Sequence, residues 1–403
     1  MYKKIGAIFL VAGTCIGSGM IALPMVLAKL GIVPSMLLML AIWSIMYYTS
    51  LINLELNLQA KHGLSLGELG KRFSGKTAEL IGTVSLKVLS YSLLAVFIYG
   101  GASIVQELID SKLGIDFSFE SIASWYALMA VGLLLLPIKQ IDYFNRLLFI
   151  TLLGVVVLLI VGLVVSIEWT HLPLFSQHYL EPSAWASVIP VVFTSFGFQV
   201  IFHTLTNYCH KDARLLKRAF FWGSLIPAIV YILWSCSILS VVYHNNSSFY
   251  VQMAEGNTEV GELIEALSGV AQWQSVQLLV WWISLLAIAT SVLGVGVGLC
   301  DSLKKMMSSR VSNANQLSLL ASILTIVPAY LIVILIPNAF IAVLGFAGMI
   351  LAIIAIILPT WLFWQIKPLK LHYEELNAKW LIHLSFAAAV GVIVCELWNM
   401  LAR

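Results

Sequence analysis

The stretch AGTCIGSGMIALP, residues 12–24, lies within an apolar run that extends from about residue 5 to residue 30. Its three glycines, Gly13, Gly17 and Gly19, each weaken a helix by about 1 kcal/mol relative to alanine. A membrane helix can unwind at such a cluster only where a cavity or a bound molecule hydrogen-bonds the freed backbone groups. Close helix packing through Gly13 and Gly17 explains the same pattern equally well, so this stretch alone leaves both interpretations open.

A second stretch repeats the pattern. IPVVFTSFGFQ, residues 189–199, places Pro190 early in another apolar run and Gly197 near its middle. The two stretches fall in the first and sixth apolar runs of the chain. Because the sixth run comes five spans after the first, and five is odd, the second set of five helices must enter the membrane upside down relative to the first. That arrangement is the inverted repeat of many secondary transporters, and it predicts two broken helices.

The composition places the whole chain in a membrane. Of its 403 residues, 61% are hydrophobic and only 10% are charged, whereas a soluble chain averages about 25% charged residues. The apolar residues come in unbroken runs of about 20, which excludes the alternating strands of a membrane β-barrel. We therefore expect an all-α integral membrane protein with a single transmembrane domain over residues 1–403 and about eleven membrane-spanning helices.

The expected spans are residues 5–30, 33–58, 79–107, 121–138, 146–167, 183–207, 218–243, 276–301, 317–336, 338–364 and 380–400. The first repeat then covers residues 5–167, the inverted second repeat covers 183–364, and 380–400 is an extra helix. All 22 Lys and Arg residues except Lys29, Lys87, Lys112 and Arg403 fall in segments on the N-terminal side of the membrane, which predicts a cytoplasmic N-terminus. Short amphipathic helices are expected over 258–270 outside and 64–73 inside.

Two broken helices create a site for a zwitterion. The half-helix after a break presents free N–H groups and a positive dipole end, and the half before it presents free carbonyls. A carboxylate is expected on the N–H groups of the first break, and an ammonium on carbonyls of both breaks. The candidate substrate-binding residues are Gly13, Thr14, Cys15, Ile16, Gly17, Ser18 and Gly19 in the first break and Phe193, Thr194, Ser195, Phe196, Gly197, Phe198 and Gln199 in the second.

Five segments carry a resemblance to a known family: GTCIGSGMIALP, PVVFTSFGFQ, GSLIPAIVYILW at 223–234, LLAIATSVLGVGVGLCD at 285–301 and PNAFIAVLGFAGMILAIIAIILP at 337–359. Together they resemble the bacterial hydroxy and aromatic amino acid permease family of the amino acid/polyamine/organocation superfamily, most closely its tyrosine-specific permeases. The resemblance implies a LeuT-like inverted-repeat fold, import across the bacterial inner membrane and proton coupling. Two departures are Gln199, where family members often have His, and Ser284-Leu285-Leu286, where many carry an acidic residue.

Ionisable side chains inside the spans are candidates for proton coupling. Lys87 lies within the third span, where a charge is costly unless it faces a cavity or loses its proton, and it is the leading candidate. A side chain that extends to the cytoplasmic surface is the alternative. Glu55 is its candidate partner, His203 is a further titratable group near neutrality, and Glu396 is expected to be peripheral.

Sodium coupling stays open because of three residues in the eighth span. Ala287, Thr290 and Ser291 share one helix face. With carbonyls of Gly13 and Ile16 they would form a five-oxygen cage for a small hard cation, and these positions resemble the sodium site of related transporters. The alternative is ordinary hydrogen bonding of the two hydroxyls to carbonyls of their own helix.

Aromatic side chains flank the second break. Phe196 and Phe198 are placed to line a flat apolar slot, and Gln199 to bind a phenol hydroxyl or a neighbouring helix. Weaker candidates, in a chain that is 11% aromatic, are Tyr91, Tyr99, Trp281 and Trp282.

Other classes of protein lack support. The chain has no HExxH, GxSxG or P-loop sequence and no clustered basic face, so we expect no enzyme, no cofactor, no resident metal and no nucleic-acid partner. Its inside segments are too short for a sensor's output domain. We expect a proton symporter that imports aromatic L-amino acids, tyrosine favoured. Sodium coupling, tryptophan preference and a transport-inactive sensor are the alternatives.

Overall fold

In a computed structural model, the described part of the chain is helical. The structure describes residues 2–402 apart from 18, 62, 138–139, 142, 144–146, 149, 153, 159–171, 271–273, 310, 312, 337–338 and 367–369, and these described residues include no strand. Within these described ranges, seven helices are long and apolar enough to cross a membrane, or eight if one bent pair counts as a single span. The chain is therefore a multi-pass membrane protein.

Except across residues 135–181, the described helices follow one another with short connections. In chain order they are α1 (Tyr2–Cys15), α2 (Gly19–Leu27), α3 (Ile32–Gln59), α4 (Leu66–Ser74), α5 (Lys76–Leu113), α6 (Phe119–Leu134), α8 (Pro182–Ser195), the 3₁₀ turn η1 (Gln199–Ile201), α9 (Phe202–Tyr208), α10 (Ala213–Asn245), α11 (Ser247–Glu255), α12 (Val260–Val270), α13 (Gln274–Met307), α14 (Ala314–Leu335), α15 (Ala339–Ala352), the π-helical turn η2 (Ile353–Ile357), α16 (Leu358–Gln365), η3 (Glu374–Asn377) and α17 (Lys379–Ala402).

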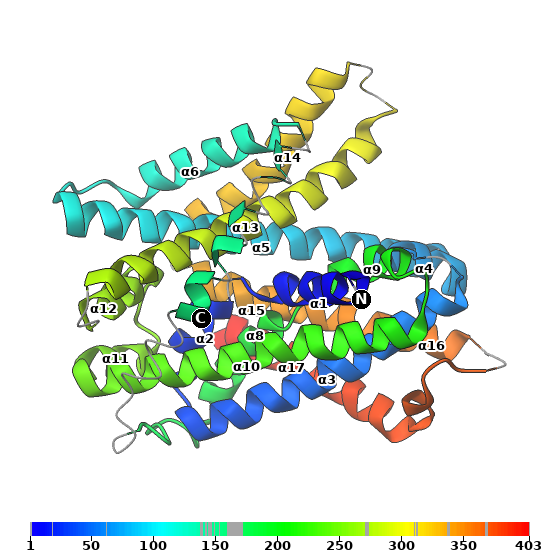
Figure 1. Ribbon diagram of the computed structural model, residues 1–403, viewed down its shortest axis with the longest axis horizontal. Helices are drawn as coiled ribbons and strands as arrows, with labels where there is room; N and C mark the ends of the chain where they lie inside the picture. The colour runs from blue at the N-terminus through cyan, green and yellow to red at the C-terminus, as the bar shows by residue number, and fades with distance from the viewer. Residues whose placement is uncertain are drawn as a thin grey trace.

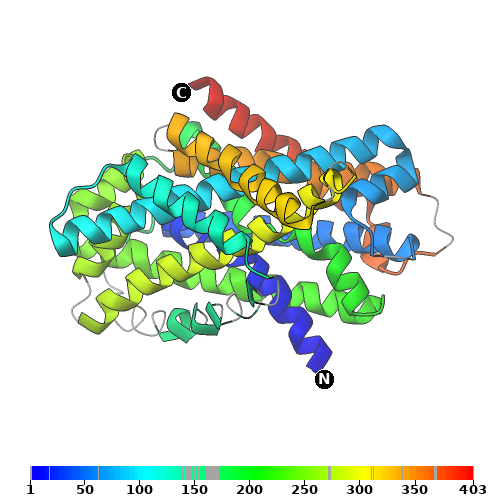
Figure 2. The ribbon, with the colours of Figure 1, turned by 90° about the horizontal axis from the view of Figure 1, so that it is seen from above.

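The helices form two groups around a central set (Figure 1). α5, α6, α13 and α14 pack together on one side, and α3 and α10 lie side by side on the other. Between them lie α1, α2, α8 and α15; α2 packs on α8, and α8 packs on α15. Seen from above, the N-terminal end of α1 and the C-terminal end of α17 project from opposite faces (Figure 2). The interrupted helices thus occupy the middle of the molecule.

Several sequence-based expectations are confirmed. Seven of the expected spans coincide with the long apolar helices, and the helices α5, α10 and α13 extend beyond the expected spans because their polar ends continue past the apolar segment. The amphipathic helix predicted over 258–270 is α12, which buries its apolar face, and the one predicted over 64–73 is α4, which begins with a capping box at Ser65 and Glu68.

The expected count of eleven spans stays a prediction. α6 has 16 residues, fewer than the ~20 needed to cross the hydrocarbon core. Much of the expected span 146–167 lies outside the described residues. The expected span 183–207 is divided among α8, η1 and α9.

Candidate functional site

The first apolar run is interrupted where its glycines cluster. α1 ends at Cys15, α2 begins at Gly19, and the two helices are bent by 50°. The Ile16 N–H still bonds the Ala12 carbonyl at 3.1 Å, and the Met20 N–H bonds the Gly17 carbonyl at 3.1 Å. Ser18, one of the residues expected to bind a carboxylate, lies outside the described residues.

The sixth run is also interrupted. α8 ends at Ser195, and the chain stays non-helical until the short turn η1 starts at Gln199. The Gln199 side-chain carbonyl accepts the Phe198 N–H at 2.8 Å, and its amide nitrogen lies 3.9 Å from the sulfur of Met46. Gln199 therefore contacts both the break itself and α3.

The two interrupted segments run in opposite directions. A Cβ atom at Gly6 would lie 2.9 Å from the Tyr208 hydroxyl, and one at Gly19 would lie 2.8 Å from Ser195 Cβ. Further along, Lys29 Nζ lies 3.4 Å from Ser187 Oγ. As the number rises along α1 and α2, it falls along the segment from α9 to α8. The pair is therefore antiparallel, and the two breaks face each other.

One tyrosine joins the carbonyl ends of both broken helices. The Tyr231 hydroxyl, from α10, lies 2.6 Å from the Cys15 carbonyl and 3.2 Å from the Ser195 carbonyl. These carbonyls belong to the last residues of α1 and α8, where unpaired oxygens and the negative dipole end gather. Two negative helix ends thus converge on a single proton donor, which is an arrangement suited to a cation with several N–H groups.

A second side chain of α10 bonds the half-helix that follows the first break. The Trp234 indole N–H donates to the Met20 carbonyl, and Trp234 and Tyr231 are both buried and one helical turn apart. Sequence reasoning missed both residues, although they lie in the quoted segment GSLIPAIVYILW. The available signal was a tyrosine in mid-span, whose hydroxyl needs a partner when buried.

The breaks are in contact in this structure. A Cβ at Gly19 would lie 2.7 Å from the Tyr231 hydroxyl, so there is no room for even a methyl group between them. Phe196 is buried and packs edge-on against Tyr231, with ring centroids 5.6 Å apart. Phe198 instead joins a cluster with Phe202 and Phe220, at 6.1 and 5.6 Å. Of the two expected aromatic residues, Phe196 thus lies beside the converging carbonyls.

The hydroxyl face expected in the eighth span also reaches the first break. A Cβ at Gly17 would lie 2.9 Å from Ser291 Oγ. Ser291 and Thr290 both donate to the Ala287 carbonyl, at 2.7 and 3.0 Å, and Thr290 also donates to the Leu286 carbonyl at 2.9 Å. The two hydroxyls therefore make the ordinary bonds within their own helix.

The remaining residues of the second break pack against α15. Thr194 Oγ1 donates to the Pro190 carbonyl at 2.8 Å and to the Leu344 carbonyl at 3.0 Å, and Ser195 Oγ donates to the Val191 carbonyl at 3.0 Å. A Cβ at Gly197 would lie 3.1 Å from the Leu351 side chain. These contacts attach the C-terminal end of α8 to a neighbouring helix, and Phe193 is buried with them.

The side chain of Lys87 contacts α13 rather than either break. Its ammonium is 3.5 Å from the sulfur of Met306, near the end of α13 that carries Lys304 and Lys305, and the side chain is half-buried. This placement agrees with a side chain that extends toward the surface. The side chain of His203 lies outside the described residues.

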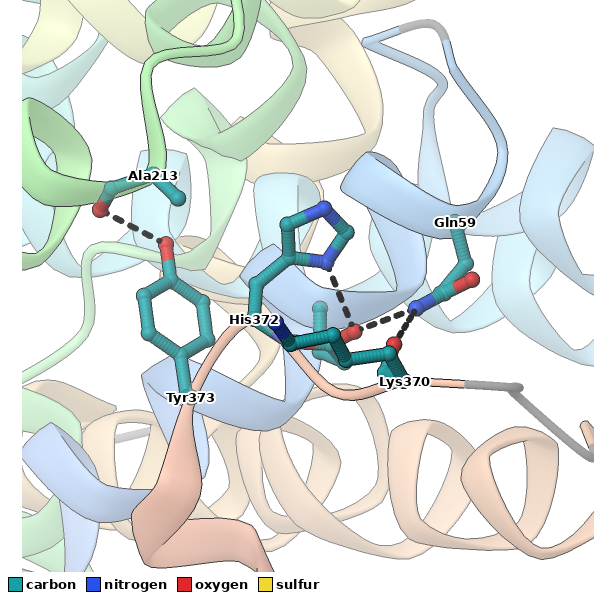
Figure 3. A network of polar contacts seen from close by, with 6 residues as sticks. Gln59, Ala213, Lys370, His372 and Tyr373 are labelled. Carbon is teal, nitrogen blue, oxygen red and sulfur yellow. Dashed lines mark hydrogen bonds and ion pairs between the residues drawn. The ribbon is translucent and has the colours of Figure 1, made fainter.

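Glu55 has a different partner from the one expected. Its buried carboxylate accepts from His372 Nδ1 and from the His372 backbone N–H, both at 3.0 Å, and from the Gln59 amide at 2.6 Å. Figure 3 shows His372 and Gln59 converging there, with Tyr373 pointing to Ala213, where its hydroxyl bonds the backbone carbonyl at 3.1 Å. The segment 370–373 thereby ties the end of α3 to the start of α10.

Glu396 is buried rather than peripheral in position. It lies in α17, where a Cβ added to Gly345 of α15 would overlap its carboxylate. The Asn399 amide lies 3.3 Å from that carboxylate and 2.9 Å from the Ala186 carbonyl of α8. A carboxyl group inside a membrane helix is therefore connected to the broken helix α8.

Comparison with known proteins gives a consistent result. The profile of the tryptophan/tyrosine permease family matches residues 1–396. The chain is 28% identical to tyrosine-specific transport system 1 of Haemophilus influenzae, over 91% of this chain and 89% of that protein. It is 29% identical to a tryptophan-specific transport protein of Pseudomonas aeruginosa, over 88% and 84%. It is also 26% identical to glutamine transporter 2 of Aliivibrio fischeri, over 89% and 88%. The family and these relatives are permeases or transporters, not enzymes.

Proposed function

The chain belongs to the tryptophan/tyrosine permease family, and on that premise we propose that it is a secondary active importer of aromatic amino acids, tyrosine favoured. We place it in the bacterial inner membrane with a cytoplasmic N-terminus, as eleven spans in two inverted repeats of five plus one helix. The observation that carries the proposal is the convergence of the Cys15 and Ser195 carbonyls on the Tyr231 hydroxyl. Alternating access would open the paired breaks to each side of the membrane in turn.

The proposed binding mode uses backbone groups at both breaks. The amino acid carboxylate bonds the N–H groups of Gly17, Ser18 and Gly19 at the start of α2, where the helix dipole favours an anion. The ammonium bonds the Cys15 and Ser195 carbonyls and displaces the Tyr231 hydroxyl from them. The ammonium has three N–H donors and the hydroxyl has one, so the substrate satisfies two helix ends at once.

Substrate binding requires the breaks to separate. Because Gly19 has no room for a methyl group against Ser195 and Tyr231, α2 and α8 must move apart before an amino acid can enter. The Phe196 ring, which already packs edge-on against a tyrosine ring, then offers the same geometry to the aromatic ring of the substrate. A preference for aromatic over glutamine side chains follows from that contact.

We propose proton rather than sodium coupling. The Ala287 carbonyl accepts the Ser291 hydroxyl at 2.7 Å, and the single proton of the Thr290 hydroxyl is shared between the Leu286 and Ala287 carbonyls, at 2.9 and 3.0 Å. The oxygen that a cation would need therefore already bonds within its own helix. Without Ala287, the cage that includes Gly13 and Ile16 is incomplete. Lys87 remains the proposed proton carrier from the sequence, and Glu396 is a second buried titratable group for the same test.

The test is uptake of labelled tyrosine by the purified chain in proteoliposomes. Proton and sodium gradients are imposed separately, with unlabelled tryptophan, phenylalanine and glutamine as competitors. Accumulation driven by an inward proton gradient and inhibited by aromatic amino acids is the expected result. Accumulation driven by sodium alone would contradict the proton assignment, and inhibition by glutamine alone would contradict the aromatic one.

A further inference from the structure

A basic groove lies at the first turns of α10, away from the two breaks. It encloses about 410 Å³ and is lined by Tyr47, Arg214, Lys217, Arg218, Phe221 and Trp222. Tyr47 belongs to α3 and the other five to α10, which pack side by side (Figure 1). The three cationic side chains stand at the polar end of a membrane helix, the level at which phospholipid headgroups lie.

The groove already binds one carboxylate. Lys217 forms an ion pair with Glu375 of η3. Burial opposes ionisation of Glu375, but the hydrogen bond and charge of Lys217 hold the pKa of its carboxyl below the usual value. Within the described part of the chain, no carboxylate lies within ion-pair distance of Arg214 or Arg218. The groove therefore attracts anions and keeps two positive charges beyond its internal pair.

The floor of the groove is aromatic, and the aromatic side chains continue from it to the exposed surface of α10. Trp43 stacks on Tyr47 with an interplanar angle of 13°, and Phe221 packs edge-on against both. Trp222 follows Phe221 with its side chain 49% exposed. An exposed tryptophan one helical turn below a cluster of arginines is typical of the boundary between headgroups and acyl chains.

We propose that this groove binds the phosphate of an anionic phospholipid. Arg214 and Arg218, one helical turn apart, hold the phosphate oxygens, since a guanidinium offers paired N–H donors to them. The rings of Tyr47, Phe221 and Trp222 contact the glycerol and the upper acyl chains. The favoured source is a lipid rather than free phosphate because half of the lining is aromatic, which a phosphate ion does not use.

The test compares lipids on the full-length chain. The purified protein is placed in nanodiscs of dioleoylphosphatidylcholine with or without dioleoylphosphatidylglycerol, and retained lipid is counted by native mass spectrometry. The variant Arg214→Gln/Arg218→Gln removes both charges. Each basic side chain contributes about fivefold to binding at an anionic surface, so we expect phosphatidylglycerol binding to fall about 30-fold. The control Lys71→Gln/Arg72→Gln removes the same charge from α4 and should leave binding unchanged.

Two further measurements keep the proposal open to refutation. If the double variant does not fold, Arg214→Gln and Arg218→Gln alone should each lower binding about fivefold. Added inorganic phosphate should leave the bound lipid in place; complete displacement by phosphate would show that the groove selects the ion alone. Equal binding of both lipids, or equal losses in the α10 and α4 variants, would also overturn the proposal.

Discussion

Replacing Tyr231 by phenylalanine removes one oxygen from the point where both broken helices end. The ring and its edge-on contact with Phe196 are kept, so the change isolates the hydroxyl. That hydroxyl lies 2.6 Å from the Cys15 carbonyl and 3.2 Å from the Ser195 carbonyl. With one proton it makes one strong bond, to Cys15, and one weaker contact, to Ser195.

The magnitude follows from that geometry. Losing a hydrogen bond costs about 0.5 to 1.5 kcal/mol, and leaving a buried carbonyl without a donor costs about 1 to 3 kcal/mol. A figure of about 1 kcal/mol is reasonable, since a water molecule can replace part of the loss. The ligand-free protein bears this cost, whereas the amino acid ammonium satisfies the same carbonyls when bound. Tyr231→Phe should therefore lower the melting temperature without ligand and strengthen tyrosine binding about fivefold.

The assay is equilibrium binding of labelled tyrosine to the purified protein, with thermal unfolding measured alongside. Tyr330→Phe is the matched control, because its hydroxyl bonds Ser124 at 2.8 Å on α6 rather than the breaks. The control should change neither quantity appreciably. Tyrosine binding by Tyr231→Phe that is unchanged or weaker would refute the idea that the hydroxyl and the ammonium compete for the same carbonyls.

The other predictions concern the breaks, the proton carrier and the groove. Gly19→Ala should reduce uptake about 5- to 150-fold while the protein still inserts, because overpacking at this contact costs about 1 to 3 kcal/mol; normal uptake by this variant would place the substrate elsewhere. Lys87→Met should abolish proton-driven accumulation but retain tyrosine exchange; if Glu396→Gln gives that result and Lys87→Met does not, Glu396 is the carrier. Glu375→Gln should raise phosphatidylglycerol binding by releasing Lys217. Because the pKa of Glu375 is lowered, its ion pair with Lys217 is intact above the usual carboxyl pKa. The pair is lost only as pH falls through the lowered pKa. Lys217 is then free to bind lipid, so lipid binding should rise in acid.

The backbone breaks were predictable from sequence because their causes are local. The cluster of Gly13, Gly17 and Gly19 lowers helix stability wherever it occurs, and in the structure α1 ends at Cys15 and α2 begins at Gly19. The spacing of apolar runs likewise predicted which segments are long membrane helices. The antiparallel relation of the two breaks followed from their offset of five spans, an odd number.

The side-chain partners were not predictable in the same way. Tyr231 is 216 residues from Cys15 and 36 from Ser195 along the chain, and nothing near it in sequence shows that its hydroxyl meets both. Glu55 was expected to pair with Lys87 but binds His372, 317 residues away. Long-range contacts of this kind depend on how helices pack, which a single sequence does not encode in any short pattern.

A structure of the full-length chain with tyrosine bound is the most direct measurement of the proposed site. The amino nitrogen of the ligand should lie within about 3.2 Å of both the Cys15 and Ser195 carbonyls, with the Tyr231 hydroxyl displaced from at least one of them. Tyrosine bound outside the paired breaks, or bound there with both carbonyls still held by Tyr231, would contradict it.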